Sequence, residues 1–231
     1  MLKYDSIYFL HIMKTGGRHL RNSVFIPMTD QLQRNNIKII NTNNYPHTGW
    51  HSKITDKTYI VTILRDPVEQ AVSLFAHGIA LDKDGKQKKV YNLSNLEKNK
   101  FLQYVVDYPE RQNFQSKSYM HDEFNNTELG NKELFLENNI FIERKNRVNL
   151  TLRTKDIKNN EKIIQEKIFL DLGIGNITKS KPAFFSNKNF YNHESKNLYD
   201  SLLDDEKKFI LDHNKIDKDL YENSKYFKIE K

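Results

Sequence analysis

The chain has 231 residues, enough for one moderate domain with a buried core, and 37% of them are hydrophobic, which excludes a disordered chain. Lys and Arg outnumber Asp and Glu by 37 to 30, so the net charge of +7 favours an anionic partner: nucleic acid, nucleotide or acidic glycan. There is no cysteine, which excludes disulfides and thiolate metal sites. No apolar run is long enough to span a bilayer. We expect a cytoplasmic protein without a membrane span.

The first predicted element is a buried strand at residues 7–12, because this stretch is short, apolar and aromatic. It ends at "KTGG", where glycines permit a tight turn, and "RHLRNSVF" continues with helical spacing. A strand, a glycine turn and a helix form a cradle for anions, because the first N–H groups of a helix lack partners. A second strand is predicted at 37–40.

A third strand is predicted at 58–64, where "TYIVTIL" is β-branched and nearly continuous, as in a central parallel strand. The strand ends at "RDP", and Pro67 suits the first turn of a helix. The residues after it place apolar side chains at helical spacing through Ile79. This is a second crossover from a strand to a helix.

The rest of the chain reads as mostly helical. The predicted elements are an exposed loop at 82–89, helices at 96–107 and 109–121, a strand at 139–143, a helix at 157–174 that stops near Gly173, a loop at 178–195 and a closing helix at 197–214. No repeat or linker interrupts the pattern. We predict one α/β domain, residues 1–231, with a central parallel sheet flanked by helices and a helical second half.

The turn "KTGG" has its lysine before the glycines, unlike the G-x-x-x-x-G-K-[ST] loop of NTPases, which this sequence does not contain. Lys14, on the strand side of the turn, would point its ammonium across the cradle, while Gly16 and Gly17 let the backbone approach an anion closely. The alternative interpretation is an ordinary turn with a solvated lysine.

A second motif, "LRDPVEQAVS", places Arg65 at the carboxyl end of the third strand and Ser73 two helical turns later. Open α/β sheets bind ligands near this edge, and an arginine with a hydroxyl can hold a phosphate. The alternative is that Arg65 pairs with Asp66 or Glu69 and that Ser73 faces another helix.

Together these motifs resemble the sulfotransferases that use 3'-phosphoadenosine 5'-phosphosulfate (PAPS), particularly the carbohydrate 2-O- and 6-O-sulfotransferases. That branch typically shows "PKTGGTS" and "LRDPVERxxS"; the counterparts here are "MKTGGRH" and "LRDPVEQAVS". The stretch "NFQSKSYM" and the tail "FILDHNKIDKDLYENSKYF" also resemble recurring family patterns. The resemblance implies a sulfotransferase architecture similar to that of P-loop NTPases.

The resemblance also implies which residues bind the donor. The 5'-phosphosulfate would be held by the turn residues Lys14, Thr15, Gly16 and Gly17, and the 3'-phosphate by Arg65 with Ser73. Arg18 and His19 stand where the family usually has small hydroxyl residues, so they are further donor-binding candidates with a changed mode of contact. Two other departures are Gln70 in place of an arginine and Met13 in place of a proline.

Transfer to a hydroxyl also needs a base, and histidine is the side chain best suited to this near neutral pH. The stretch "YPHTGWHSKI", between the two phosphate motifs, offers His47 and His51. We favour His51, because "GWHS" resembles the family's glycine-histidine element, and keep His47 as the reserve. Trp50 is either an apolar wall of the site or part of the core. His11, at the end of a buried strand, is expected to be structural.

The leading hypothesis is therefore a sulfotransferase that moves the sulfuryl group from PAPS to a hydroxyl acceptor, with adenosine 3',5'-bisphosphate (PAP) as product. The resemblance implies a saccharide as the acceptor. Lys14 would stabilise the departing phosphate oxygen, and no catalytic metal is expected because no H-E-x-x-H or similar spacing is present. The alternatives are a P-loop-like nucleotide kinase and a non-catalytic basic module that binds an anion or glycan. Nucleic acid is not the expected partner, since no familiar motif for it appears.

Overall fold

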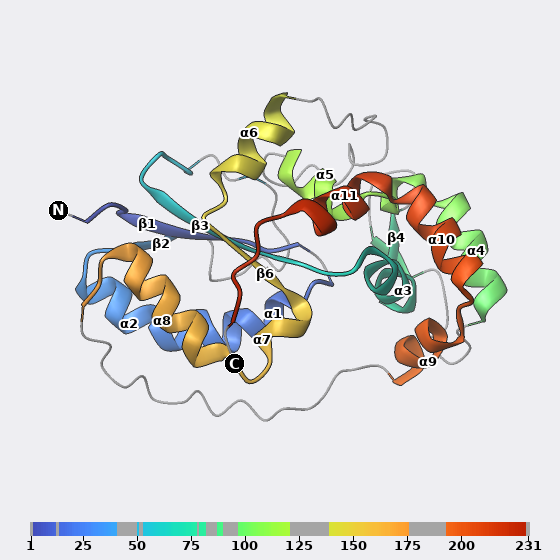
Figure 1. The fold of residues 1–231 in the computed structure, drawn as a ribbon, viewed down its shortest axis with the longest axis horizontal. Helices are drawn as coiled ribbons and strands as arrows, with labels where there is room; N and C mark the ends of the chain where they lie inside the picture. Colours follow the sequence, from blue (N-terminus) through green and yellow to red (C-terminus); the bar gives the residue numbers. More distant parts are fainter. Residues whose placement is uncertain are drawn as a thin grey trace.

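The computed structural model describes residues 2–12, 14–40, 50, 53–77, 79–81, 87–89, 97–120, 139–175 and 193–229. Its central sheet has four strands, all parallel, in the order β2-β1-β3-β6 (Figure 1). These are β1 (Ser6–Leu10), β2 (Lys38–Ile40), β3 (Thr58–Leu64) and β6 (Leu150–Arg153). The α/β class and the central parallel sheet are confirmed, and three of the four strands lie where the sequence predicts them.

The central strands β1 and β3 are buried along their whole length, which explains their nearly continuous apolar sequence. Their register pairs Phe9 with Val61 and Leu10 with Thr62. The fourth strand, β6, has no counterpart in the sequence prediction. It has only four residues, and their alternating burial does not stand out locally.

The helix after the glycine turn is longer than predicted and changes its winding. It runs through α1 (Gly17–Leu20), a π-helical turn η1 (Arg21–Phe25) and α2 (Ile26–Arg34) without interruption. A π turn leaves backbone carbonyls poorly bonded, and here Gln165 compensates by donating from Nε2 to the Ser23 carbonyl at 3.0 Å. Gln165 lies on α8 (Glu161–Leu172), so this hydrogen bond links α8 to the π-helical turn η1.

Pro67 begins α3 (Pro67–His77), as predicted. The chain then forms a small antiparallel pair, β4 (Ile79–Leu81) with β5 (Gln87–Lys89). The predicted helix therefore extends too far, because α3 ends at His77. The predicted loop at 82–89 also extends too far, because residues 87–89 form β5. A helix, α4 (Lys98–Asp107), follows close to its predicted bounds.

The predicted helix at 109–121 is two segments, a 3-10 turn η2 (Pro109–Arg111) and α5 (Phe114–Met120). They are separated at Asn113, whose φ of 50° lies in the left-handed region. The predicted strand at 139–143 is wrong, because these residues begin α6 (Asn139–Arg147). The short apolar run at 140–142 resembles a strand, but only Phe141 of the three is buried, and it packs edge-on against Tyr119 of α5, with ring centroids 5.9 Å apart.

The carboxyl-terminal part is helical. A short helix α7 (Thr154–Ile157) precedes α8, which ends at Gly173 with φ 73°, as predicted. The predicted closing helix at 197–214 is instead two helices, α9 (His193–Ser201) and α10 (Asp204–His213), and a third helix, α11 (Lys215–Asn223), follows it. Most of the predicted loop at 178–195 lies outside the described residues.

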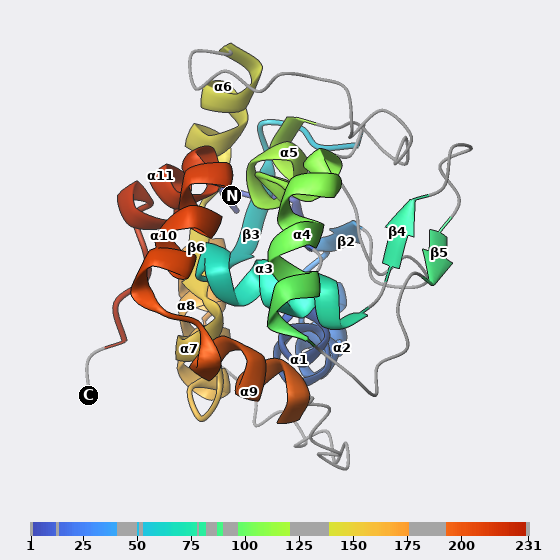
Figure 2. The same cartoon turned by 90° about the vertical axis from the view of Figure 1, so that its right-hand side faces the viewer.

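Helices cover both faces of the sheet. On one face α2 and α8 pack against alternate residues of β1 and β3, and on the other face α5, α6 and α11 pack against the residues between them (Figure 1). A third apolar cluster joins α3, α4, α9 and α10 beyond the carboxyl ends of the strands (Figures 1 and 2). None of the described helices is both long and apolar enough to cross a membrane.

Gly17 provides a test of the turn's packing. A Cβ atom at this position would collide with the half-buried His11 ring, which would have to shift from its stack on Phe9, where the ring centroids are 5.2 Å apart. We expect Gly17→Ala to lower the free energy of unfolding by about 1–3 kcal/mol, the usual cost of overpacking. Gly175→Ala is the matched control, because a Cβ there would meet nothing within 4 Å. Equal urea midpoints for the two variants would contradict the close packing at Gly17.

Candidate functional site

Three parallel strands end side by side and bring both sequence motifs to one edge of the sheet. The turn at 14–17 follows β1, Arg65 follows β3, and Arg153 is the last residue of β6, opposite Leu64 in the register. Ligands of open α/β sheets bind at the carboxyl ends of such strands. The predicted donor-binding residues therefore lie at the edge where a ligand is expected.

The turn exposes backbone N–H groups at the start of the helix. Lys14 and Gly16 both have positive φ, 65° and 90°, and the Gly16 carbonyl accepts hydrogen bonds from the N–H groups of His19 and Leu20. The N–H groups of Gly17 and Arg18 donate to no acceptor in the described part of the chain. These two groups are what an anion at the turn would bind.

A direct hydrogen bond joins the two motifs. Arg65 donates from Nη1 to the Lys14 carbonyl at 3.1 Å and from Nε to Glu69 Oε2 at 3.0 Å. The pair of Arg65 and Glu69 considered as an alternative is therefore present. The same guanidinium nevertheless fixes the turn, so that the lysine and the arginine are held close together.

Thr154, which no sequence pattern indicated, also bonds to the turn, from the end of β6. Its hydroxyl lies 2.7 Å from the Thr15 carbonyl, to which it donates, and 3.3 Å from the Leu64 carbonyl. Its methyl group would be 3.2 Å from a Cβ at Gly16, so a larger residue at Gly16 would be crowded as well as strained. The ends of β1, β3 and β6 thus meet at one side chain.

Positive charge is concentrated beside the turn. Burial, with the nearby Arg65 and Arg18 guanidinium groups, lowers the pKa of Lys14. Such a lowered pKa is typical of a group placed for a ligand, although structural clusters show it too. On the other side of Arg65, Asp66 accepts from the N–H groups of Val68 and Glu69, both at 3.0 Å, and so caps α3.

The backbone of Arg65 is held by Gln115, a fully buried residue of α5. The Gln115 side chain accepts from the Arg65 N–H through Oε1 and donates to the Arg65 carbonyl through Nε2, both at 2.9 Å. Both backbone groups of Arg65 are therefore satisfied at the residue where the chain leaves the sheet. Gln115 lies in the stretch "NFQSKSYM" that resembled a family pattern.

Helix α11 holds Gln115 in position. Asp217 accepts from the N–H groups of Gln115 and Ser116 and from the Ser116 hydroxyl, at 2.9, 2.7 and 2.6 Å. In the opposite direction, Asn113 Oδ1 accepts from the N–H groups of Ile216 and Asp217. Each helix thus caps the amino terminus of the other, because the first N–H groups of both find side-chain oxygens across the contact.

Other predicted residues have different surroundings. The Thr15 hydroxyl is buried and donates to the Ile12 carbonyl at 2.8 Å, so only the backbone of Thr15 faces the turn. His19 Nε2 lies 2.8 Å from Glu161 Oε1 on α8. Ser73 lies four residues after Glu69 on α3, on the same helical face as this partner of Arg65, and no hydrogen bond joins it to Arg65 within the described residues.

The two base candidates, His47 and His51, lie outside the described residues, as do Met13 and the loop at 178–192. Trp50 is described and is buried at 7% exposure, with the guanidinium carbons of Arg144 and Arg147 at 5.3 and 5.6 Å from its ring. Trp50 therefore belongs to the core. His11, beneath Gly17 and stacked on Phe9, has the structural surroundings expected for it.

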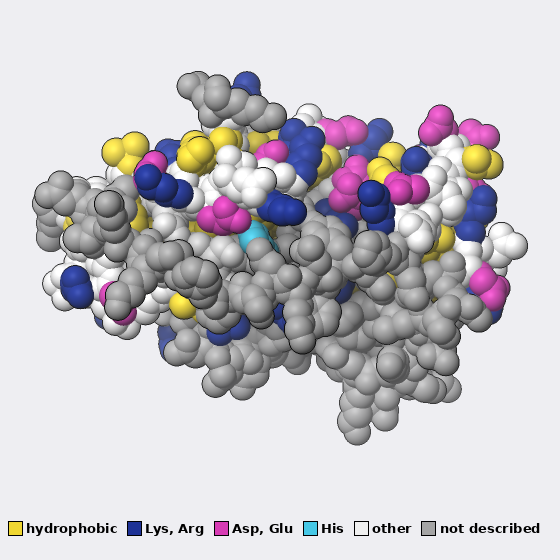
Figure 3. Space-filling view, turned by 90° about the horizontal axis from the view of Figure 1, so that it is seen from below, with side chains coloured by type: hydrophobic (Ala, Val, Ile, Leu, Met, Phe, Trp, Pro, Cys, Tyr) yellow, Lys and Arg dark blue, Asp and Glu magenta, His cyan; other side chains and the backbone are white. Residues whose placement is uncertain are grey.

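The charges elsewhere on the described surface are mixed. On the face in Figure 3, dark blue Lys and Arg side chains are interspersed with magenta Asp and Glu side chains, without a continuous basic stripe among the residues that are coloured. No group of three or more His, Cys, Asp or Glu in the described ranges could hold a metal ion.

No family model, curated protein or solved structure matches the chain. The functional interpretation therefore depends on the two motifs and the contacts between them.

The buried carboxyl of Asp217 makes stability depend on pH. Burial raises the pKa of Asp217 to about 6, although its hydrogen bonds oppose this effect. The folded state thus binds more protons than the unfolded state between about pH 4 and pH 6. We therefore expect the free energy of unfolding to fall by about 3 kcal/mol as the pH rises from 4 to 6. Asp217→Asn should lack this component in urea unfolding measured at pH 4, 5, 6 and 7.

Asp205→Asn, an exposed change on α10, is the control and should keep the pH dependence of the wild type. Parallel curves for the wild type and Asp217→Asn would show that Asp217 does not titrate in this window.

Proposed function

We propose that the chain is a PAPS-dependent sulfotransferase with a P-loop-like donor site at the carboxyl edge of its sheet. The observation that carries the proposal is the hydrogen bond from Arg65 to the Lys14 carbonyl, which holds the two sequence motifs together. PAPS carries two anionic groups, a 5'-phosphosulfate and a 3'-phosphate, and each motif would bind one of them. The acceptor would be a hydroxyl, with a saccharide favoured by the family resemblance.

The donor set at the turn fits a phosphosulfate. Lys14, Arg18 and Arg65 supply positive charge, and the N–H groups of Gly17 and Arg18 are free to donate within the described chain. A Cβ at Gly17 would collide with the His11 ring, so glycine keeps this position of the turn free of a side chain. Ser73, on the same helical face as Glu69, is the proposed hydroxyl for the 3'-phosphate.

PAPS would supply the sulfuryl group, and the residues of this chain would position it and neutralise charge. In an in-line displacement the bond from sulfur to the phosphate oxygen breaks while the bond from sulfur to the acceptor oxygen forms. The Lys14 ammonium would stabilise the departing phosphate oxygen, and its partial burial strengthens that interaction. The acceptor proton would pass to His51, a role that depends on the sequence resemblance alone.

Nucleotide preference tests the proposal most directly. At about one hundred times its dissociation constant, a ligand that binds only the folded state stabilises it by about 2.7 kcal/mol. We expect PAP to raise the melting temperature more than ATP with magnesium does. A larger effect of ATP with magnesium would favour the kinase alternative, and no effect of either would contradict the donor site.

Arg65→Ala should weaken PAP binding by about ten- to a hundredfold, since a hydrogen bond to a charged group contributes about 1.5–3 kcal/mol. Arg34→Ala removes the same charge from the exposed end of α2 and should leave the affinity unchanged. Titration calorimetry measures both. Because Arg65 also fixes the turn, the melting temperature of each apo variant is recorded alongside.

Turnover measurements distinguish the proposed role of Lys14 from that of the catalytic base. A labelled-sulfate screen over glycans, lipids and small alcohols first identifies an acceptor. With that acceptor, Lys14→Ala should lower kcat by about 10²–10³-fold through lost charge stabilisation. His51→Ala should lower kcat by about 10²–10⁴-fold and leave PAP binding intact. His47→Ala tests the reserve candidate and should keep full turnover if His51 is the base; full turnover in His51→Ala would reject the assignment of the base to His51.

A further inference from the structure

A histidine and a glutamate from distant parts of the chain meet beside the donor turn. His19 Nε2 lies 2.8 Å from Glu161 Oε1, and the two side chains are 36% and 27% exposed. His19 is the third residue of the helix that begins at Gly17, and Glu161 is the first residue of α8. Glu161 has no part in the donor contacts described above, and the way in which His19 would contact the donor is not yet specified.

The two helices run in the same direction and begin at the same edge of the sheet. His19 contacts Glu161, and four residues further along both helices Gln165 donates to the Ser23 carbonyl. Two contacts in the same order along the chain show that the helices are parallel, and Figure 1 shows α8 alongside the helix that starts with α1. The pair of His19 and Glu161 therefore lies at the carboxyl edge of the strands, where the donor would bind.

The contact with Glu161 determines which nitrogen of His19 is available. A carboxylate only accepts hydrogen bonds, so Nε2 carries a proton and donates it. Nδ1 makes no hydrogen bond among the described residues, and the partial exposure of the side chain leaves the ring open to a ligand. Side chains of a helix lean toward its amino terminus, so the ring leans toward the free N–H groups of Gly17 and Arg18.

We propose that His19 binds the 5'-phosphate of the donor through Nδ1 and that Glu161 is the residue that positions it. This inference rests on the proposed function, because it adds a contact to the same donor site. A neutral ring with its proton on Nε2 has only a lone pair at Nδ1, so the ring takes up a proton when the phosphate binds and donates from both nitrogens. Glu161 then balances the charge of the ring on one side and the phosphate balances it on the other.

The surroundings of the pair favour an anion as the third partner. The neighbouring charged residues on the same two segments are mostly cations: Arg18 and Arg21 on the helix of His19, and Asp156, Lys158 and Lys162 around Glu161. A protonated His19 adds to this positive charge, and Glu161 is the carboxylate in contact with it. A phosphate at Nδ1 would lower the remaining repulsion among these cations.

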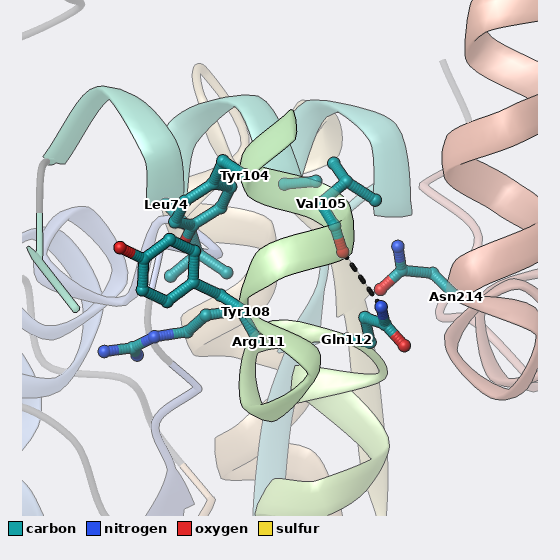
Figure 4. Close-up of a pocket in the computed structure, with 8 residues that line it drawn as sticks. Leu74, Tyr104, Val105, Tyr108, Arg111, Gln112 and Asn214 are labelled. Atoms are coloured by element: carbon teal, nitrogen blue, oxygen red, sulfur yellow. Dashed lines mark hydrogen bonds between the residues drawn. The ribbon is translucent and has the colours of Figure 1, made fainter. Parts of the chain in front are cut away.

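The pocket in Figure 4 is too small to compete for the donor. It lies between α3, α4 and η2, and its cavity of about 10 Å³ has room for about one water molecule. Gln112, one of the side chains that line it, already donates to the Val105 carbonyl at 2.9 Å. The experiments therefore address the carboxyl edge of the sheet.

Calorimetric titration with PAP at pH 8 tests both residues. We expect His19→Gln to raise the dissociation constant about ten- to a hundredfold, because a hydrogen bond to a charged group is lost. Glu161→Gln keeps the shape of the side chain but loses its charge, and should raise the dissociation constant about tenfold, as for other carboxylates that orient a ligand-binding histidine. Glu166→Gln removes the same charge from a more exposed position on α8 and is the matched control, with unchanged affinity.

Lower pH separates positioning from a purely structural role. At pH 6 the ring of the Glu161→Gln variant is protonated more readily, so its affinity should recover toward that of Glu166→Gln, whereas His19→Gln should remain weak at both pH values. Titrations in buffers of different ionisation enthalpy should show that the wild type takes up more protons per PAP than His19→Gln does. The ¹⁵N resonances of the His19 ring in the wild type should show a proton on Nε2 alone in the free protein at pH 8 and on both nitrogens in the PAP complex.

Equal PAP affinities of His19→Gln, Glu161→Gln and Glu166→Gln would overturn this inference and leave the donor site in place. A His19 ring that stays neutral in the PAP complex would do the same, and this measurement does not depend on the folding of any variant. If the wild type binds no PAP, the proposed function fails and this inference fails with it.

Discussion

The side chain of Gln115 bonds to both backbone groups of Arg65, at the residue where β3 leaves the sheet. A strand end is normally free to fray, because its last N–H and carbonyl have no neighbour to pair with. Here those groups are held from α5, and α5 is held by Asp217 of α11. The direction in which the Arg65 side chain leaves the sheet is thus determined by helices about 50 and 150 residues further along the chain.

The hydrogen-bonded support continues from Arg65 to the turn at residues 14–17. The Arg65 guanidinium bonds to the Lys14 carbonyl, and Thr154 bonds to the next carbonyl of the turn. Lys14 is therefore fixed by contacts from two neighbouring strands rather than by its own sequence neighbours. Rigid placement of a first contact by a second layer of hydrogen bonds is what a binding site requires. This layered support is the strongest structural argument that the edge binds a ligand.

Local sequence predicted those features that local physics determines. The strand at 58–64 was placed to the residue, because a continuous β-branched run ends abruptly at a proline motif. The roles of Gln115 and Thr154 could not be predicted, since their partners lie 50 and 139 residues away and no periodic pattern marks such contacts. The strand predicted at 139–143 is wrong for a related reason: Phe141 is buried against Tyr119 of α5, and the short apolar run around Phe141 does not reveal that contact.

The backbone of Lys14 adds a point about selection. A φ of 65° is easy for glycine and asparagine, but costs another L-residue about 1 kcal/mol. A chain selected for stability alone would carry glycine at this position, as it does two residues later, where φ is 90°. Keeping a long, partly buried cation in a left-handed conformation sacrifices folding energy. The role proposed for its ammonium at the donor site would account for a lysine at this position despite that cost.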